Sequence, residues 1–321
     1  MVKSERLQVN SLPKGYRLPE YLIEKPISEG GFSIVYLATH LPTRNRVVIK
    51  EFFPVKYAKR IETGRVETIT EEASRAFGLG IKRFFNEGSA LAKINHQNVV
   101  HVTHIFRANN TVYMVMDFEV GRDMRWYIKR KNGGLSEKFL RTVFPEVLSG
   151  MRELHKNHIL HLDIKPANIL LRSGGHPLLI DFGAVKHMKG AANLEVKGHT
   201  LTQGFAPIEQ HNHGNIGPWS DIYAIGATMY SCITGKPPPS AIERVKKDKL
   251  ESMVRSFEKK KYSPSLLEAI NSAMKMDLTE RPQTIEEFMG MLDVETASPS
   301  KIMTFLNKPM LRSGTKKTDA I

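Results

Sequence analysis

The stretch from Ile159 to Gly183 constrains the fold of this chain more than any other part of the sequence. Two apolar runs, each of the length of a β-strand, flank a Ser-Gly-Gly turn at residues 173–175. This pattern predicts a hairpin with polar side chains at both of its ends. These polar side chains are His161, Asp163, Lys165, Asn168 and Asp181.

Three of these side chains carry oxygen atoms that we expect to meet on one side of a cleft. Asn168 and Asp181 supply amide and carboxylate oxygens, which suit a hard cation such as Mg²⁺. Asp163 would then remain free to accept a proton. The alternative interpretation of the pattern is an ordinary core hairpin whose polar residues lie on the surface.

The spacing of these residues resembles the motifs of a known family. His-x-Asp-x-Lys-x-x-Asn from His161 to Asn168, followed by Asp-Phe-Gly from Asp181, is similar to the catalytic loop and metal-binding motif of the eukaryotic-like protein kinases. The opening Lys-Glu-Phe-Phe-Pro at residues 50–54 resembles the bacterial members most. Lys165 stands two residues after Asp163, as in the serine/threonine kinases.

The resemblance covers about residues 21–292 and implies an α+β, two-lobed protein kinase-like fold. A β-rich N-lobe with one key helix would precede a helical C-lobe. The expected division is an N-terminal lead-in at 1–20, the N-lobe at 21–119, the C-lobe at 120–292 and a flexible tail at 293–321.

A turn rich in Gly and Ser lies between two expected strands at 21–27 and 34–38, and a third strand is expected at 47–50. Such a turn can lay its backbone N–H groups over phosphates, although Gly-Gly also occurs in ordinary hairpins. With the third strand it resembles the kinase Gly-rich loop and strand lysine. Ser28 and Ser33 replace the first and third glycines of the family, and Val48 replaces its usual Ala. The nucleotide-binding residues implied here are Ser28, Glu29, Gly30, Gly31, Phe32, Ser33, Val35, Val48 and Lys50.

The remaining N-lobe combines a long mixed stretch with a helix and a buried strand. Residues 51–64 read as a loop, and apolar periodicity predicts a helix over 81–94. The resemblance pairs Glu87 of this helix with Lys50. The apolar run 112–118 predicts a buried strand, where the resemblance places Met116 as the gatekeeper beside the adenine. It places the backbone of Asp117 and Glu119 on the adenine edge.

The C-lobe pattern is helical. Helices are expected over 124–131, over a long segment capped by Ser136, and over 222–233, 266–276 and 284–292. Asp221 is expected to cap the helix at 222, and the resemblance implies that it also anchors the backbone of the catalytic loop. Residues 204–210 resemble the Ala-Pro-Glu close of an activation segment, in which Glu209 pairs with Arg281.

The activation segment would contain Thr200 and Thr202. The resemblance places Thr202 where its hydroxyl contacts the catalytic Asp163 and Lys165. Leu162 stands where many kinases have an Arg that binds a phosphate on this segment. We therefore expect that basal activity does not require phosphorylation of Thr200, unless other basic residues such as Arg83 or Lys186 bind a phosphate there.

Composition limits the other classes of protein. The chain has 321 residues, 41% hydrophobic and 25% charged, with a single cysteine, Cys232, which excludes an internal disulfide. No apolar run suits a signal peptide or a membrane span, so we expect a cytoplasmic protein. The net charge of +14 is spread along the chain, and direct nucleic-acid binding is therefore not expected. His211 and His213 lack further metal ligands nearby and read as loop residues.

The resemblance thus implies a serine/threonine protein kinase that uses ATP and Mg²⁺ to phosphorylate protein substrates in signalling. Asp163 and Lys165 would be catalytic, and Asn168 and Asp181 would hold the metal. One alternative is a pseudokinase that acts as a nucleotide- or partner-binding regulatory module. Another is a small-molecule phosphotransferase of the same broad fold. The sequence leaves the oligomeric state open.

Overall fold

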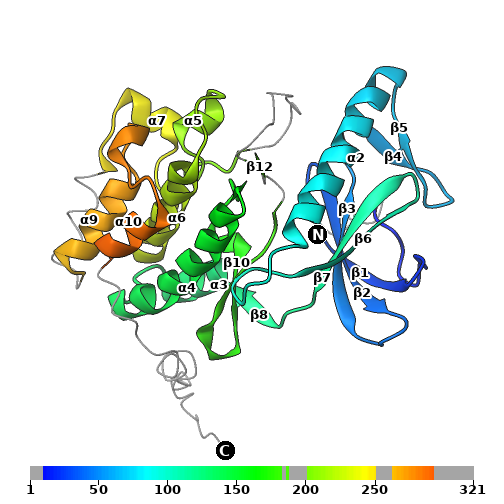
Figure 1. The fold of residues 1–321 in the computed structure, drawn as a ribbon, viewed down its shortest axis with the longest axis horizontal. Coiled ribbons are helices and arrows are strands. Elements are labelled where there is room, and N and C mark those ends of the chain that lie inside the picture. The colour runs from blue at the N-terminus through cyan, green and yellow to red at the C-terminus, as the bar shows by residue number, and fades with distance from the viewer. Residues whose placement is uncertain (1–9, 183–185, 188–200, 251–261, 293–321) are drawn as a thin grey trace, which may run out of the picture.

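A computed structural model describes residues 10–182, 186–187, 201–250 and 262–292, which form a β-rich lobe and a helical lobe (Figure 1). The β-rich lobe contains a five-stranded antiparallel sheet in the order β1-β2-β3-β7-β6. The central strands are rich in β-branched and aromatic residues, and β7 is buried along almost its whole length. The strands are β1 (Tyr21–Glu29), β2 (Ser33–His40), β3 (Arg46–Phe52), β6 (Val102–Ala108) and β7 (Thr111–Asp117).

One long helix, α2 (Glu71–Leu91), packs against this sheet. It begins well before the predicted start at Ile81, because Thr70 caps it by accepting a hydrogen bond from the backbone of Ala73. Gly80 lies within the helix, where an added Cβ would lie 2.4 Å from the ring of Phe52. Gly80 therefore permits close packing of helix and sheet.

The stretch predicted as a loop after β3 contains a small hairpin instead. Strands β4 (Ala58–Arg60) and β5 (Val66–Thr68) pair antiparallel, and Gly64 takes a left-handed conformation (φ +85°) in the turn between them. The described end of the N-terminal lead-in is also packed, since Leu12 is fully buried. Both segments lie on the β-rich lobe.

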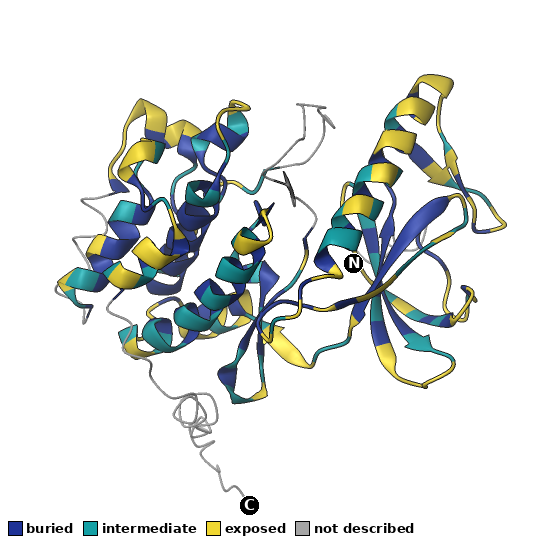
Figure 2. Cartoon of the chain, viewed as in Figure 1, coloured by how far each residue is buried: buried dark blue, intermediate teal, exposed yellow. Residues whose placement is uncertain are grey.

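The helical lobe is built around α6, in which nearly every residue is buried. Gly226 of α6 lets the helix approach Ala273 and Met274 at the end of α9. Figure 2 shows the buried faces of these helices turned toward one another and their exposed faces outward. The helices are α3 (Met124–Lys131), α4 (Glu137–Lys156), α5 (Ile208–His211), α6 (Pro218–Thr234), α7 (Ala241–Lys246), α9 (Pro264–Ala273) and α10 (Ile285–Met291).

The hairpin predicted from the sequence forms at the base of the helical lobe. Strand β10 (Ile169–Arg172) pairs with β11 (Pro177–Leu179) and with β8 (Gly121–Asp123), while β9 (Ile159–Leu160) pairs with β12 (Lys186–His187). The polar residues between β9 and β10 form a loop that ends in a 3-10 turn, η1 (Pro166–Asn168).

Several predicted boundaries differ from the structure. Ser136 caps α4 as predicted, but α6 begins at Pro218 after Gly217, so Asp221 lies in the first turn and is not the N-cap. The predicted tail at 293–321 lies outside the described residues. Among the helices that the structure describes, none is both long enough and apolar enough to cross a membrane.

Candidate active site

The loop between β9 and β10 holds Asp163 in a dense hydrogen-bond network. The ammonium of Lys165 lies 2.7 Å from Asp163 Oδ2, and the amide of Asn168 donates to the same oxygen over 3.0 Å. The hydroxyl of Thr202 donates to Asp163 Oδ1 over 2.9 Å and accepts from Lys165 over 3.0 Å. The structure therefore brings together Asp163, Lys165, Asn168 and Thr202, which the sequence analysis placed in one site.

The backbone of this loop is anchored by a buried carboxylate. Asp221 accepts hydrogen bonds from the backbone N–H groups of His161 (2.9 Å) and Leu162 (2.7 Å), and one from the ring of His155 (2.9 Å). Burial by itself raises the pKa of Asp221, but these donors outweigh it and hold the pKa below its ordinary value. No sequence motif pointed to His155, which lies near the end of α4.

Leu162 adopts a left-handed conformation (φ +61°), a strained one for a γ-branched residue. Its N–H donates to Asp221, and its carbonyl accepts a hydrogen bond from the side chain of Gln210 over 3.0 Å. The side chain of Leu162 is buried. Asp221 and Gln210 thus hold the strained turn from two sides, which fixes the direction of Asp163.

His161 is fully buried and its ring lies 4.8 Å from that of Phe182, centroid to centroid. Burial lowers the pKa of His161, in spite of the carboxylates of Asp221, Asp163 and Asp181 nearby. The imidazole is therefore neutral near pH 7 and acts as a packing group between the loop and Phe182.

Asn168 and Asp181 are neighbours through their backbones, because the N–H of Ile180 donates to the carbonyl of Asn168 over 2.9 Å. The side-chain amide nitrogen of Asn168 donates to Asp163, so its side-chain oxygen is the atom that would bind a metal ion. The side chain of Asp181 is 48% exposed, so one carboxylate oxygen remains accessible. One amide oxygen and one carboxylate fit Mg²⁺, which binds few protein ligands together with phosphates and water.

Lys50 of β3 reaches across to this group. Its ammonium lies 2.5 Å from Asp181 Oδ1 and holds the pKa of Asp181 below its ordinary value. The expected ion pair between Lys50 and Glu87 is absent from the described part of the chain. Burial instead raises the pKa of Glu87 to about 8, against the opposing influence of Lys50 and Arg83. Because the Lys50 ammonium forms its ion pair with Asp181, it does not offset the burial of Glu87. The Glu87 carboxyl therefore stays protonated at neutral pH.

The expected nucleotide residues of the sheet share one face. Val35 pairs with Lys50, and Val48 pairs with the buried Met116 on the neighbouring strand. Side chains two apart along a strand lie on the same side, so Val35, Val48, Lys50 and Met116 form one surface. Asp117 follows at the exposed end of β7, and Glu119 forms an ion pair with Arg172 at 3.4 Å.

The Gly-rich loop is a tight turn between β1 and β2. Ser28 and Glu29 extend β1, and the N–H of Gly30 donates to the carbonyl of Ser33 over 2.8 Å. Gly31 and Phe32 form the tip of the turn. The loop keeps a short turn although serines replace two of the family glycines.

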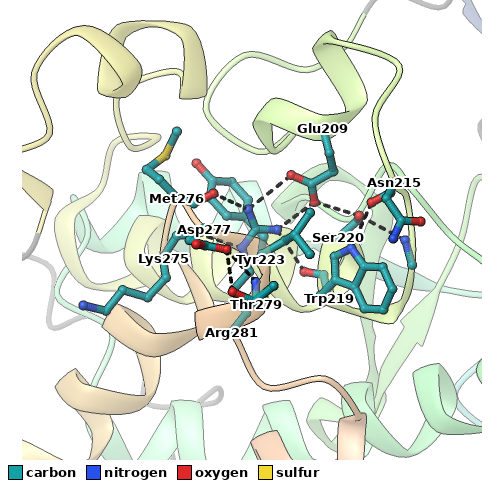
Figure 3. A network of polar contacts seen from close by, with 12 residues as sticks. Glu209, Asn215, Trp219, Ser220, Tyr223, Lys275, Met276, Asp277, Thr279 and Arg281 are labelled. Atoms are coloured by element: carbon teal, nitrogen blue, oxygen red, sulfur yellow. Dashed lines mark hydrogen bonds and ion pairs between the residues drawn. The ribbon is translucent and has the colours of Figure 1, made fainter.

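A buried ion pair ties the segment after Thr202 to the helical lobe (Figure 3). Arg281 donates to both oxygens of Glu209, at 2.7 and 3.2 Å, and both side chains are almost completely buried. Ser220 donates to Glu209 over 2.8 Å, and the guanidinium of Arg281 lies over the ring of Tyr223. The pair predicted from the sequence is therefore present.

The remaining predictions concern residues away from this network. Thr200 lies outside the described residues, and so does Gly183. His211 and His213 belong to no cluster of metal-ligating side chains within the described ranges, and Cys232 is a buried core residue whose thiol pKa is raised by burial.

A β-rich lobe joined to a helical lobe, with Asp181 at the strand lysine Lys50 and Asn168 hydrogen-bonded to Asp163, is the arrangement that the resemblance to the protein kinases implies. The family model described as the protein kinase domain matches residues 21–291. The chain belongs to the protein kinase family, which confirms the predicted fold class and family.

The chain is also similar to individual kinases. Serine/threonine-protein kinase D of Synechocystis sp. is 28% identical over 280 residues, which make up 84% of this chain and 51% of that protein. Serine/threonine-protein kinase PrkC of Bacillus subtilis is 26% identical over 281 residues, 86% of this chain and 40% of that protein. The chain spans about half the length of the curated relatives that it matches first.

A solved structure gives the same fold. The chain described as PpkA-294 in its apo form superposes with a TM-score of 0.76 and is 34% identical, covering 88% of this chain and 100% of that one. The structural likeness extends over both lobes.

Proposed function

We propose that this protein transfers the γ-phosphoryl group of ATP to serine or threonine hydroxyls of protein substrates, with Mg²⁺ as cofactor. The observation that carries the proposal is the network of Asp163 with Lys165, Thr202 and Asn168. Phosphoryl transfer depends mainly on positioning and on the neutralisation of charge, and these side chains supply both.

Asp163 is the catalytic acceptor in this proposal. Its two oxygens are held by three donors, so the carboxylate cannot rotate away from a substrate hydroxyl. It orients the hydroxyl and accepts its proton as the bond to phosphorus forms. Lys165, bonded to both Asp163 and Thr202, adds positive charge beside the transferred group.

The nucleotide would lie against the face shared by Val35, Val48 and Met116, under the Gly-rich loop, with its adenine edge at the backbone of Asp117 and Glu119. Lys50 would reach the α- and β-phosphates, which requires its ammonium to leave Asp181. Asn168 and Asp181 would hold Mg²⁺, which supplies charge neutralisation at the phosphate oxygens. Once released, Lys50 can pair with Glu87, whose carboxyl then loses its proton.

We also place the protein in the cytoplasm. Its one cysteine, Cys232, is buried and reduced, as in proteins that fold in a reducing compartment.

The test is an incubation of the purified full chain with γ-labelled ATP and a generic basic protein, with Mg²⁺ and with a chelator. Label should enter serine and threonine only when Mg²⁺ is present.

In a titration with ATP, Asp181→Asn should weaken Mg²⁺-dependent binding, because it removes the charged ligand. A wild-type protein that binds ATP but transfers no label would be a regulatory module, and equal affinities of wild type and Asp181→Asn would disprove the metal assignment.

A further inference from the structure

A buried carboxylate lies directly behind the strand lysine. Glu51 follows Lys50 on β3, so its side chain points to the opposite face of the sheet, and it is completely buried. The hydroxyls of Tyr36 (2.7 Å) and Tyr113 (2.6 Å) donate to it, as does the guanidinium of Arg60 (2.6 Å). A buried charge persists only when it is paired and hydrogen-bonded, and these three donors meet that requirement.

Both tyrosines remain protonated donors. Burial raises the pKa of Tyr36 and Tyr113 far above the ordinary value, and the neighbouring Glu51 carboxylate raises it further. The two tyrosine hydroxyls therefore keep their protons and donate to Glu51 at neutral and mildly alkaline pH.

Arg60 extends the cluster toward the N-terminus. This residue lies in the β4–β5 hairpin, and its side chain is only 6% exposed. Besides Glu51, it donates to the backbone carbonyls of Asn10 (2.6 Å) and Gly64 (2.8 Å). Its guanidinium also lies over the ring of Phe53, 4.9 Å from the centroid. Arg60 thus joins the sheet, the hairpin and the segment at residues 10–12.

The segment at residues 10–12 leads from Arg60 to the Gly-rich loop. The backbone N–H of Leu12 donates to the hydroxyl of Tyr36 over 3.1 Å, which seats the segment on the sheet. The side-chain amide of Asn10 then donates to the carboxylate of Glu29 over 3.2 Å. Glu29 is the last residue of β1 before the turn of the loop.

A second connection holds the tip of the same loop. The N–H of Phe53 donates to the carbonyl of Phe32 over 2.8 Å, and the N–H of Val55 donates to that of Gly31 over 3.2 Å. The loop is therefore attached on one side through Asn10 and on the other side through the chain that enters the hairpin.

We propose that Asn10 and Arg60 are positioning residues that hold the Gly-rich loop in its nucleotide-binding conformation before ATP arrives. The inference rests on the proposed binding of ATP under this loop. Ordering a loop on binding costs conformational entropy, and contacts that order it beforehand reduce this cost. The β4–β5 hairpin and residues 10–12 then serve as a brace for phosphate binding.

The test compares Asn10→Ala with Asn86→Ala, a matched change of an exposed Asn on α2, in the full chain. Hydrogen exchange of the amides at residues 30–34 is measured without nucleotide, and the Kd of an ATP analogue with Mg²⁺ by calorimetry. Asn10→Ala should speed loop exchange and raise the Kd about 2- to 10-fold, the range expected for one hydrogen bond. The melting temperature should fall by no more than a few degrees, and the exchange of β7 and the kcat should stay unchanged. Every property of Asn86→Ala should stay unchanged.

A further variant checks the direction of the effect. Asn10→Asp places a second carboxylate beside Glu29, so it should loosen the loop and raise the Kd more than Asn10→Ala does. Arg60→Met should loosen the loop and also lower the melting temperature, because it leaves Glu51 buried with one donor fewer.

The outcomes separate this inference from the proposed function. Unchanged loop exchange in both Asn10 variants would overturn the brace, whether or not the protein binds ATP. Faster loop exchange in a protein that binds no nucleotide would support the brace and reject the proposed function.

Discussion

The ion pair between Glu209 and Arg281 gives a sharp test of how the activation segment is attached. Arg281→Met removes the guanidinium and keeps an apolar stem of similar length. It leaves the Glu209 carboxylate buried, with Ser220 as its remaining donor. Removing one partner of a buried pair costs about 3–5 kcal/mol, which is a large share of the roughly 5–15 kcal/mol that stabilises a domain. We therefore expect the equilibrium constant for folding of the helical lobe to fall by about 10²–10⁴-fold.

Urea unfolding followed by tryptophan fluorescence measures this loss. Both tryptophans, Trp126 and Trp219, belong to the helical lobe, and the carbonyl of Trp219 accepts a hydrogen bond from Arg281. The double variant Glu209→Gln with Arg281→Met removes the stranded charge, so it should be more stable than Arg281→Met by at least about 1 kcal/mol. A loss below about 1 kcal/mol in Arg281→Met, the usual worth of a surface pair, would refute the reasoning.

Three further predictions concern the site. Lys50→Met should leave the melting temperature close to that of wild type and nearly abolish phosphoryl transfer; a much lower melting temperature would make Lys50 a structural residue. The folded protein keeps the Glu87 proton up to about pH 8, whereas the unfolded chain releases it near the ordinary 4.5, so stability should fall as pH rises between these values. Glu87→Gln should lack this fall, and parallel urea midpoints of the two proteins from pH 5 to 9 would contradict the burial of Glu87. Thr200→Ala and phosphatase-treated wild type should keep their activity while Thr202→Ala loses most of it, and a large loss in the first two would show that the segment needs a phosphate.

Local patterns explain the parts of the fold that the sequence predicted well. The hairpin of β10 and β11 depends on two apolar runs and a glycine turn, which are adjacent in the sequence. The cap of α4 at Ser136 is equally local. The pair of Glu209 with Arg281 joins distant segments, and the family resemblance supplied it.

Contacts between distant segments explain the errors. The β4–β5 hairpin has short strands with few apolar residues, and it is fixed by Arg60 reaching Glu51. Arg and Glu are usually exposed, so the sequence does not predict that Arg60 and Glu51 form a buried pair. The helix α2 begins early because Thr70 caps it, and it continues through Gly80, which packs against Phe52. Apolar periodicity alone does not show this contact.

The predicted pair of Lys50 and Glu87 was wrong for this structure for an electrostatic reason. The ammonium of Lys50 contacts Asp181, whose side chain is 48% exposed, whereas Glu87 is less exposed and burial raises its pKa to about 8. The sequence identifies Lys50, Glu87 and Asp181, but it does not show which of the two acids forms the ion pair with Lys50.

The most direct test of the account is the single-turnover rate of phosphoryl transfer from ATP to a serine- or threonine-containing protein, in wild type and Asp163→Ala. Asp163→Ala should still bind ATP, because the hydrogen bonds of the Asp163 side chain within the described ranges go to Lys165, Asn168 and Thr202 and not to the residues assigned to the adenine. Its transfer rate should fall by about 10²–10⁴-fold, the usual worth of a positioned base. A transfer rate equal to that of wild type would contradict the assignment of Asp163 and, with it, the proposed mechanism.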